Sequence, residues 1–228
     1  MKPLIIIPAR GGSKGIPKKN IKPLNGKPLI YYSIDIAREL ADEKDICVST
    51  DDDEIIKVVE DYKLHVPFKR PMEFATDNAG TSEVLLHALE HYEALGRKYD
   101  AIVLLQPTSP LRKAYQVTEA LRLFTLAIDM VVSVKKSHAA SVICSENAQG
   151  FIALSLSKNG VSRQALSDYY EYNGAIYVIN VASLKKFKLA GLTKIIKYVM
   201  PNIDSVDIDT PLDWEIAETL ANKLTVKE

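Results

Sequence analysis

Basic side chains and glycines are concentrated at the start of the chain, directly after a short apolar run. The first 34 residues contain seven lysines or arginines and no acid. Within them, Arg10-Gly11-Gly12-Ser13-Lys14-Gly15 follows the apolar run 4–7 almost at once. Glycines let backbone N–H groups turn toward an anion, and the Ser13 hydroxyl adds a donor. Arg10, Lys14 and Lys19 supply the charge that neutralises a polyphosphate, so this segment predicts a phosphate-binding loop.

The loop does not match the two best-known nucleotide-binding fingerprints. The Walker pattern GxxxxGK[ST] is absent, and the spacing of Gly11, Gly12 and Gly15 is not GxGxxG. The sequence therefore gives little support to an ordinary kinase or an NAD-dependent dehydrogenase.

The other end of the chain is the electrostatic complement of this loop. Residues 204–218 hold six acids and no base, and Asp207 and Asp209 are two positions apart. In an extended segment, side chains at that spacing point to the same face. Two adjacent carboxylates repel unless a cation lies between them, and Mg²⁺ with phosphate oxygens suits them. A basic loop and a carboxylate-held Mg²⁺ are the equipment of phosphoryl or nucleotidyl transfer, and solvated aspartates capping the last helix are the alternative. Asp213 and Glu215 are expected to be first-turn acids of that helix.

The elements that must position these groups alternate along the chain. Apolar runs predict strands at 4–7, 46–49, 101–105, 130–134, 175–180 and 195–199, and helical periodicity predicts helices at 28–40, 54–62, 83–95, 115–127 and 211–224. We expect Asp51–Asp53 to cap the second helix, and Thr81 or Ser82 to cap the third. This order predicts an α/β protein with a Rossmann-like three-layer fold and a mostly parallel sheet, whose ligands bind beyond the carboxyl ends of the strands.

Length and composition limit the organisation and the partners. The 228 residues suit a single domain over 1–228, in which the polar region at about 135–170 breaks the pattern and predicts an arm or insertion. Lysine plus arginine and aspartate plus glutamate each number 29, which argues against a nucleic-acid binder. No apolar run is long enough to span a membrane, and two cysteines do not make a disulfide framework. We therefore expect a cytoplasmic protein with no membrane partner.

Five segments stand in an order typical of one family. They are Ile7-Pro8-Ala9-Arg10-Gly11-Gly12-Ser13-Lys14-Gly15-Ile16-Pro17-Lys18-Lys19-Asn20, Arg70-Pro71 with Ala75-Thr76-Asp77, Leu104-Leu105-Gln106-Pro107-Thr108-Ser109-Pro110-Leu111-Arg112, Asn173-Gly174-Ala175-Ile176-Tyr177, and Asp207-Ile208-Asp209-Thr210. Over nearly its whole length the chain resembles the acylneuraminate cytidylyltransferases, the CMP-sialic acid synthetases.

The resemblance implies a role for each candidate residue. The triphosphate of CTP would be bound by Arg10, Ser13, Lys14, Lys19 and Asn20, and the cytidine pocket would be lined by Arg70, Ala79 and Thr81. The sugar would contact Gln106, Arg163 and Asn173, and Mg²⁺ would be held by Asp207 and Asp209. Catalysis would rest on Arg10, Lys19 and the two aspartates, with Lys19 stabilising charge on the α-phosphate and the leaving pyrophosphate.

The resemblance also implies a reaction and an assembly. The anomeric hydroxyl of an acidic nine-carbon sugar would attack the α-phosphorus of CTP, giving a CMP-sugar and pyrophosphate. The enzyme would be a homodimer whose arm near 135–170 reaches into the partner's site. No side chain stands out as the general base.

One departure from the family pattern leaves the sugar open. Many members carry Arg-Pro before the Asn-Gly pair, where this sequence has Glu171-Tyr172. A glutamate there repels a carboxylate or faces a hydroxylated substituent, so N-acetylneuraminate, KDN, legionaminate and pseudaminate all remain candidates. Kdo is less expected, because the loop of its cytidylyltransferases differs. A nucleotide-binding regulatory protein without turnover is a further alternative, against which Lys19, Asp207 and Asp209 argue.

Overall fold

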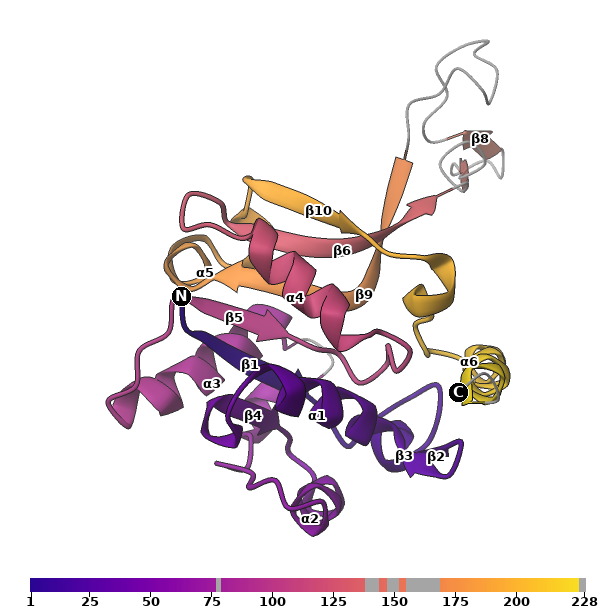
Figure 1. Cartoon of the computed structure of the whole chain (residues 1–228), viewed down its shortest axis with the longest axis horizontal. Helices are drawn as coiled ribbons and strands as arrows, with labels where there is room; N and C mark the ends of the chain where they lie inside the picture. The colour runs from indigo at the N-terminus through magenta and orange to yellow at the C-terminus, as the bar shows by residue number, and fades with distance from the viewer. Residues whose placement is uncertain (77–78, 138–143, 147–151, 155–168, 226–228) are drawn as a thin grey trace.

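A six-stranded sheet forms the centre of the molecule in the computed structural model, which describes residues 1–76, 79–137, 144–146, 152–154 and 169–225 (Figure 1). Its strands lie in the order β10-β6-β9-β5-β1-β4. Their bounds are β1 Pro3–Pro8, β4 Ile46–Ser49, β5 Ala101–Leu104, β6 Met130–Ser137, β9 Tyr169–Asn180 and β10 Ile195–Val199. Two small hairpins stand outside the sheet, β2 (Pro23–Leu24) with β3 (Lys27–Pro28), and β7 (Cys144–Glu146) with β8 (Ile152–Leu154).

The sheet is mostly parallel, as the sequence predicts, and one central strand runs the other way. β1 pairs in parallel with β4 and β5, and β6 pairs in parallel with β10. Between these groups, β9 is antiparallel to both β5 and β6. The start of β9 therefore lies at the edge of the sheet where the parallel strands end, so Asn173 reaches the same edge as the glycine loop.

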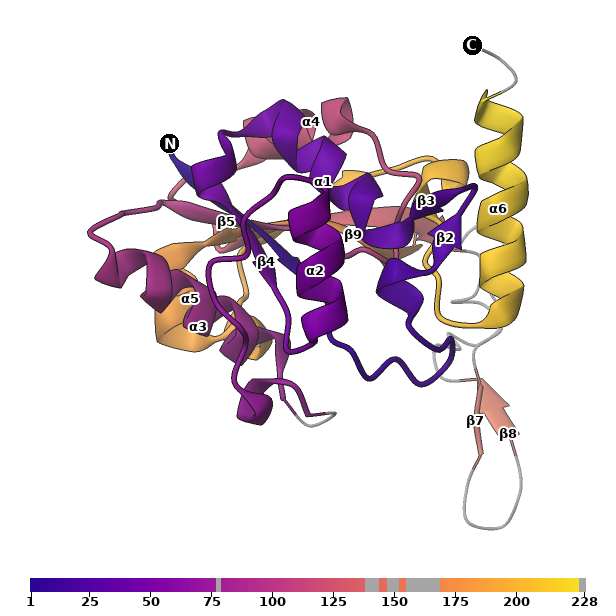
Figure 2. The ribbon, with the colours of Figure 1, turned by 90° about the horizontal axis from the view of Figure 1, so that it is seen from below.

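Helices cover both faces of the sheet, which gives the three layers expected (Figure 2). They are α1 (Leu29–Leu40), α2 (Asp53–Asp61), α3 (Thr81–Ala94), α4 (Ala114–Leu123), α5 (Val181–Phe187) and α6 (Pro211–Thr225). Successive side chains of β1 point to opposite faces of the sheet and therefore belong to two apolar clusters. Ile5 and Ile7 pack with the layer of α1, α2 and α4. Leu4 and Ile6 pack with the layer of α3 and α5. The strands are buried on both faces, which is why they are continuous apolar runs.

The last helix, α6, lies beside the β2–β3 hairpin at one end of the molecule (Figure 2). A third apolar cluster holds it there: Ile16, Leu24, Leu29, Ile208, Trp214 and Ala217. Ile16 comes from the glycine loop and Ile208 from between the two candidate metal ligands. The two distant ends of the sequence are therefore joined by a common core.

Three local predictions need correction. The N-cap of α3 is Gly80 without a side-chain cap, because the Ser82 hydroxyl instead accepts a hydrogen bond from Leu189 N at 3.0 Å. α4 ends at Leu123, four residues early, because Phe124 turns extended and is buried. β6 and β9 extend to Ser137 and back to Tyr169, so both ends of the predicted arm are paired strands of the main sheet.

Candidate active site

The glycine loop after β1 is held by residues of the neighbouring connection between β4 and α2. Asp51 Oδ1 accepts a hydrogen bond from Gly11 N at 3.2 Å, and the buried Asn20 donates from Nδ2 to Arg10 O at 3.0 Å. Asp52 caps α2, as predicted, and packs so closely on Gly11 that a Cβ there would lie 2.3 Å from its Oδ2. This contact requires glycine at position 11.

Lys19 joins the basic loop to the acidic segment near the C-terminus. Its Nζ donates to Ile208 O at 2.6 Å and to Asp209 Oδ1 at 3.1 Å. The Lys19 side chain is only 12% exposed, whereas that of Asp209 is 74% exposed. The lysine is thus fixed by burial, and the aspartate opens to solvent beside it. The pairing of the two halves expected from the sequence is present.

Asp209 is itself fixed by its neighbours on both sides. Asp213 Oδ2 accepts from Asp209 N at 3.1 Å, from Thr210 N at 2.7 Å and from Thr210 Oγ1 at 2.7 Å. These bonds lower the pKa of the Asp213 carboxyl, chiefly through the Thr210 hydroxyl. On the loop side, Gly15 approaches so closely that a Cβ would lie 2.2 Å from Asp209 O. Asp213 is a first-turn acid of α6, as predicted.

A pocket of about 290 Å³ opens between these groups. It brings together seven of the predicted residues, because the loop after β1 and the loop after β5 meet there. Its walls are Pro8, Arg10, Ser13, Lys14, Gly15, Lys19, Asn20, Gln106, Pro107, Thr108 and Asp209. Seven of these residues are basic or donate through amide and hydroxyl groups, so the pocket suits a polyphosphate.

A second, larger pocket of about 610 Å³ lies on the other side of the acidic segment. It is lined by Lys135, Lys136, Glu171, Tyr172, Asn173, Asn202, Ser205, Val206, Asp207, Asp213 and Ile216. Asp207 thus faces this pocket, and Asp209 faces the first one. The pair stands where a ligand in one pocket would meet a ligand in the other.

Neighbouring protein atoms crowd the Asp207 carboxyl, although its side chain still reaches solvent. This loss of water raises its pKa, and repulsion from Asp209 adds to the effect, whereas a hydrogen bond from Thr108 and the charge of Lys19 oppose it. A raised carboxyl pKa means that the negative charge is under-compensated by the protein. A cation bound there would relieve it.

The chain bends sharply at Asn173 and Gly174, where β9 carries a bulge opposite Ser133. Gly174 has φ +74°, and a Cβ on it would lie 3.0 Å from both Asp207 Oδ2 and Gln106 Oε1. The bulge therefore sets β9 directly against both site residues.

Buried hydrogen bonds occupy the Asn173 side chain. Its Oδ1 accepts from Ser133 Oγ at 2.5 Å and from Ala175 N at 3.2 Å, and its Nδ2 donates to Ser205 Oγ at 2.8 Å. In this structure the Asn173 amide supports the wall of the pocket. Its predicted contact with a sugar stays a prediction that requires one of these bonds to be exchanged.

Glu171, the departure from the family pattern, is partly neutralised within the protein. It lies opposite Lys135 in the β6–β9 register, and Lys135 Nζ is 3.4 Å from its Oε2. The Ser137 hydroxyl donates to its other carboxylate oxygen. Lys136 also lines this pocket, so its lining has two lysines together with the carboxylates of Glu171, Asp207 and Asp213.

The residues predicted for the cytidine pocket stand behind the glycine loop. Arg70 is 4% exposed and lies 3.4 Å from Asp51, the residue that also holds Gly11. Burial lowers the pKa of its guanidinium. Ala79 and Thr81 lie at the start of α3, where Thr81 is exposed. None of the three lines the 290 Å³ pocket, and their roles stay predictions. Arg163 lies outside the described residues.

The donors present suit Mg²⁺. Within the described ranges, no group of three or more His, Cys, Asp or Glu side chains gathers to hold a metal. Asp207 and Asp209 alone would leave most coordination positions of the ion to oxygen atoms of other groups. Mg²⁺ is usually held this way, by one or two carboxylates, phosphates and water. The two aspartates therefore fit the ion as part of a site that substrate phosphates complete.

Comparison with known proteins decides the family. Residues 4–176 match the family model described as cytidylyltransferase. The chain belongs to this cytidylyltransferase family. It is 36% identical over 220 residues to the N-acylneuraminate cytidylyltransferase of Streptococcus agalactiae serotype V, covering 94% of this chain and 52% of that protein. The chain thus spans about half the length of that relative.

A second relative matches this chain along nearly the whole length of both proteins. The CMP-N,N'-diacetyllegionaminic acid synthase of Legionella pneumophila is 32% identical over 231 residues, which is 96% of each chain. Among solved structures, CMP:2-keto-3-deoxy-manno-octonic acid synthetase in complex with CTP superposes with a TM-score of 0.72 at 19% identity, covering 98% of this chain and 100% of that one. That structure supports the fold, which is the α/β architecture predicted.

Several residues that hold the candidate active site were not among those predicted from the sequence. Asp51 contacts Gly11, and Thr108 contacts Asp207. Each acts through the tertiary fold, so the local sequence around it carries no signal of its role. Asp213 was expected only as a helix acid, although its spacing of three from Thr210 resembles a capping box and could have indicated that it fixes the turn. Arg112 was noted only as part of a motif.

Proposed function

We propose that this chain transfers CMP from CTP to an acidic nine-carbon sugar of the nonulosonate class and releases pyrophosphate. The observation that carries the proposal is the meeting of two pockets at Asp207 and Asp209, with Lys19 bonded to Asp209 between them. A pocket suited to polyphosphate and a second pocket lined by charged and amide side chains, which share one acidic border, suit a group transfer between two bound substrates.

The nucleotide side would act by neutralising charge. Arg10, Ser13, Lys14 and Asn20 line the smaller pocket and would bind the triphosphate. Lys19 is held by Ile208 O and Asp209, so its ammonium group is already placed before substrate binds. A preorganised cation stabilises charge that develops during transfer without further rearrangement.

The proposed reaction joins the two substrates at the α-phosphorus. The oxygen of the sugar's anomeric hydroxyl would form a bond to the α-phosphorus of CTP, and the hydroxyl proton would pass to water. The bond from that phosphorus to the bridging oxygen of the β-phosphate breaks, and pyrophosphate leaves with the electron pair. Arg10 and Lys19 would stabilise the charge on the departing group. Gln106, which borders both Gly174 and the smaller pocket, would orient the sugar.

Asp207 and Asp209 would hold Mg²⁺ when nucleotide is bound. The ion would supply positive charge at the phosphate oxygens. The raised pKa of Asp207 and the exposure of Asp209 support this assignment, since both carboxylates lack full compensation from the protein.

The larger pocket is where the sugar would bind. The cations of its lining are Lys135 and Lys136, and its carboxylates are Glu171, Asp207 and Asp213, so an acidic sugar is supported by the named relatives and not by an excess of positive charge. The two named relatives act on an N-acylneuraminate and on a diacetyllegionaminate by their names. We propose a sugar of this group, with KDN, pseudaminate and Kdo as further candidates.

A panel assay tests the proposal. Pyrophosphate release would be measured with CTP, Mg²⁺ and each of N-acetylneuraminate, KDN, legionaminate, pseudaminate and Kdo. Release with at least one nine-carbon acid, and little with ATP or GTP in place of CTP, is the expected result. CTP binding without release for any sugar would favour the alternative of a non-catalytic nucleotide-binding protein.

The assembly and the location come with this proposal. We infer a homodimer, which is supported by apolar side chains left exposed on the edge strand β10, namely Ile195, Ile196 and Val199. Light scattering on the purified chain would give twice the monomer mass, and a monomer would contradict the inference. No described helix is long and apolar enough to cross a membrane. The cytoplasmic location stays a prediction.

A further inference from the structure

Arg112 is a buried charge that the proposed reaction does not use. It lies in the loop between β5 and α4 and is 2% exposed. Burial lowers the pKa of its guanidinium to about 9, so the group still carries its charge near neutral pH. Removing a charge from water is costly, and apolar side chains of similar volume often serve a core at least as well. A buried arginine here therefore asks for a specific explanation.

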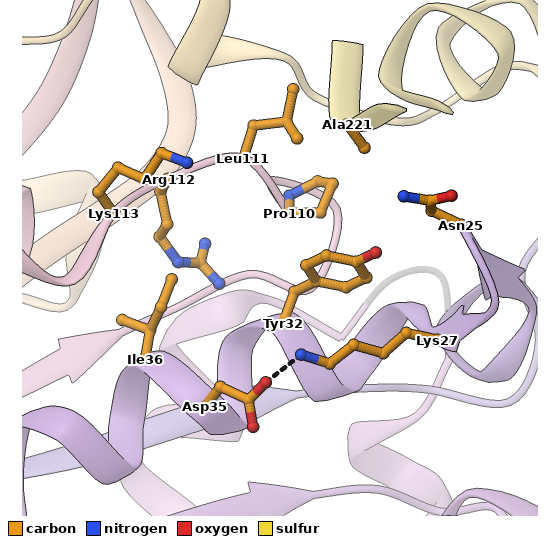
Figure 3. A pocket seen from close by; sticks show the side chains of 10 residues that line it. All are labelled: Asn25, Lys27, Tyr32, Asp35, Ile36, Pro110, Leu111, Arg112, Lys113 and Ala221. Atoms are coloured by element: carbon orange, nitrogen blue, oxygen red, sulfur yellow. Dashed lines mark hydrogen bonds and ion pairs between the residues drawn. The ribbon is translucent and has the colours of Figure 1, made fainter. Parts of the chain in front are cut away.

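The guanidinium ties three segments together. Its Nη1 donates to Gln106 O at 2.8 Å and to Ala175 O at 2.9 Å, and its Nη2 donates to the Ser33 hydroxyl of α1. Among the described residues, no carboxylate forms an ion pair with it, and its Nε has no hydrogen-bond partner. Figure 3 shows the side chain running from its loop toward α1, at the wall of a pocket of about 260 Å³.

The two carbonyls that Arg112 binds belong to segments that border the two pockets: Gln106 lines the smaller one, and Ala175 lies in the β9 bulge whose Asn173 lines the larger one. Gln106 is the candidate sugar contact after β5, and Ala175 follows Gly174 in the β9 bulge. Gly174 in turn lies against both Gln106 and Asp207. One planar donor group thus sets the distance between Gln106 and the bulge, and its charge attracts Asp207 from behind.

We propose that Arg112 is a positioning residue for the sugar half of the site, acting by fixing Gln106 relative to the Gly174–Ala175 bulge. This inference rests on the proposed function. The inference goes beyond the proposed function because it assigns the alignment of the sugar to Arg112, a side chain that contacts neither substrate. The nucleotide half should be less affected, because Arg112 bonds to none of the loop residues Arg10, Ser13, Lys14 and Lys19 that line the smaller pocket, and reaches that pocket only through Gln106.

The test compares Arg112→Met and Arg112→Lys with Asn180→Ala. Asn180 makes a suitable control because it also donates from the interior to two backbone carbonyls, Leu126 O and Ile128 O, but at the opposite end of β9. Arg112→Met and Asn180→Ala each leave two backbone carbonyls without this donor, and Asn180→Ala also removes the N-cap of α5, so we expect a clear loss of thermal stability in both variants.

The expected kinetic result separates the variants. For Arg112→Met, KM for the sugar rises and kcat falls, each by about 10-fold or more, while KM for CTP stays within about 2-fold. Arg112→Lys, which keeps the charge and one hydrogen bond, recovers part of the loss. Asn180→Ala keeps both KM values near those of the wild type. Parallel changes for CTP and sugar in Arg112→Met, or equal sugar defects in Asn180→Ala, would overturn the positioning role.

A second readout does not depend on turnover. Amide hydrogen exchange of Arg112→Met should speed up in the segments 105–112 and 173–177 and stay unchanged in the remainder of the sheet. Uniform acceleration across the sheet would overturn the inference. A wild-type protein that releases no pyrophosphate would refute the proposed function, whereas the exchange result would still decide the local role of Arg112.

Discussion

Among single residues, Lys19 is the side chain on which the proposed chemistry depends most. Its Nζ bonds to Ile208 O and Asp209, so in the proposed reaction one ammonium group would serve both the leaving phosphates and the acidic segment. We predict that Lys19→Met lowers kcat by about 100-fold or more, because one preorganised charge donor is lost. Steady-state pyrophosphate release measures the effect.

The adjacent lysine provides a matched control. Lys18 Nζ is exposed and pairs with Glu54 at 2.6 Å, away from the pocket. Lys18→Met should keep kcat within about 2-fold of the wild type, because an exposed ion pair contributes little. Equal losses in the two variants would mean that the loop needs its net charge and not a placed Lys19.

Asp207 should oppose stability in the absence of substrate. Its pKa is raised by loss of water and by Asp209, so the folded state holds this proton more tightly than the unfolded state. Stability from this group is therefore present at acidic pH and is lost as the pH rises through the raised pKa. We predict that Asp207→Asn raises the Tm of the Mg²⁺-free protein at neutral pH and abolishes turnover. Thermal melts across pH measure the first effect.

The contribution of Asp213 to stability has the opposite pH dependence to that of Asp207, although both residues lie on the same segment. Its pKa is lowered, first by the Thr210 hydroxyl, so its contribution is present above the ordinary carboxyl pKa and is lost as the pH falls through the lowered value. Asp213→Asn should lower the Tm at neutral pH. The same sign of change in both variants would contradict these assignments.

At the scale of elements, the contact of the glycine loop with the segment before α6 is the tightest in the site. A Cβ on Gly15 would lie 2.2 Å from Asp209 O, whereas a Cβ on Gly12 would meet nothing within 4 Å. We predict that Gly15→Ala lowers the free energy of unfolding by about 1–3 kcal/mol, because the two segments must separate. Urea titration of Gly12→Ala should show a change within about 0.5 kcal/mol. Equal losses would contradict the close approach.

The sequence predicted most elements because their signals are local. The buried run 4–7 and the helical spacing in 28–40 both correspond to real elements. The direction of β9 was not predictable, because its run at 175–180 shows burial but not which neighbours it pairs with. For the same reason, the loop residues around Lys19 could be predicted, whereas Asp51 and Arg112 act only through partners distant in sequence.

At the scale of the whole molecule, the site depends on the joining of both ends of the chain. Trp214 of α6 is buried against Ile16 and Leu24, and Lys22 Nζ lies 4.2 Å from its ring centre. Because the chain has a single tryptophan, fluorescence reports the docking of α6 alone. We predict that unfolding in urea followed by fluorescence coincides with unfolding followed by circular dichroism. An earlier fluorescence transition would show that α6 separates before the sheet unfolds.

The transfer of CMP itself is tested most directly by phosphorus NMR of one reaction containing the chain, CTP, Mg²⁺ and the sugar that the panel selects. We predict that the three CTP resonances decline while one phosphodiester resonance and pyrophosphate appear in equal amounts, and that Asp209→Ala prevents both. CDP with inorganic phosphate would indicate a different bond cleavage. Unchanged CTP, with every candidate sugar and with the nucleotide bound, would contradict the assignment of Lys19, Asp207 and Asp209 to a transfer site.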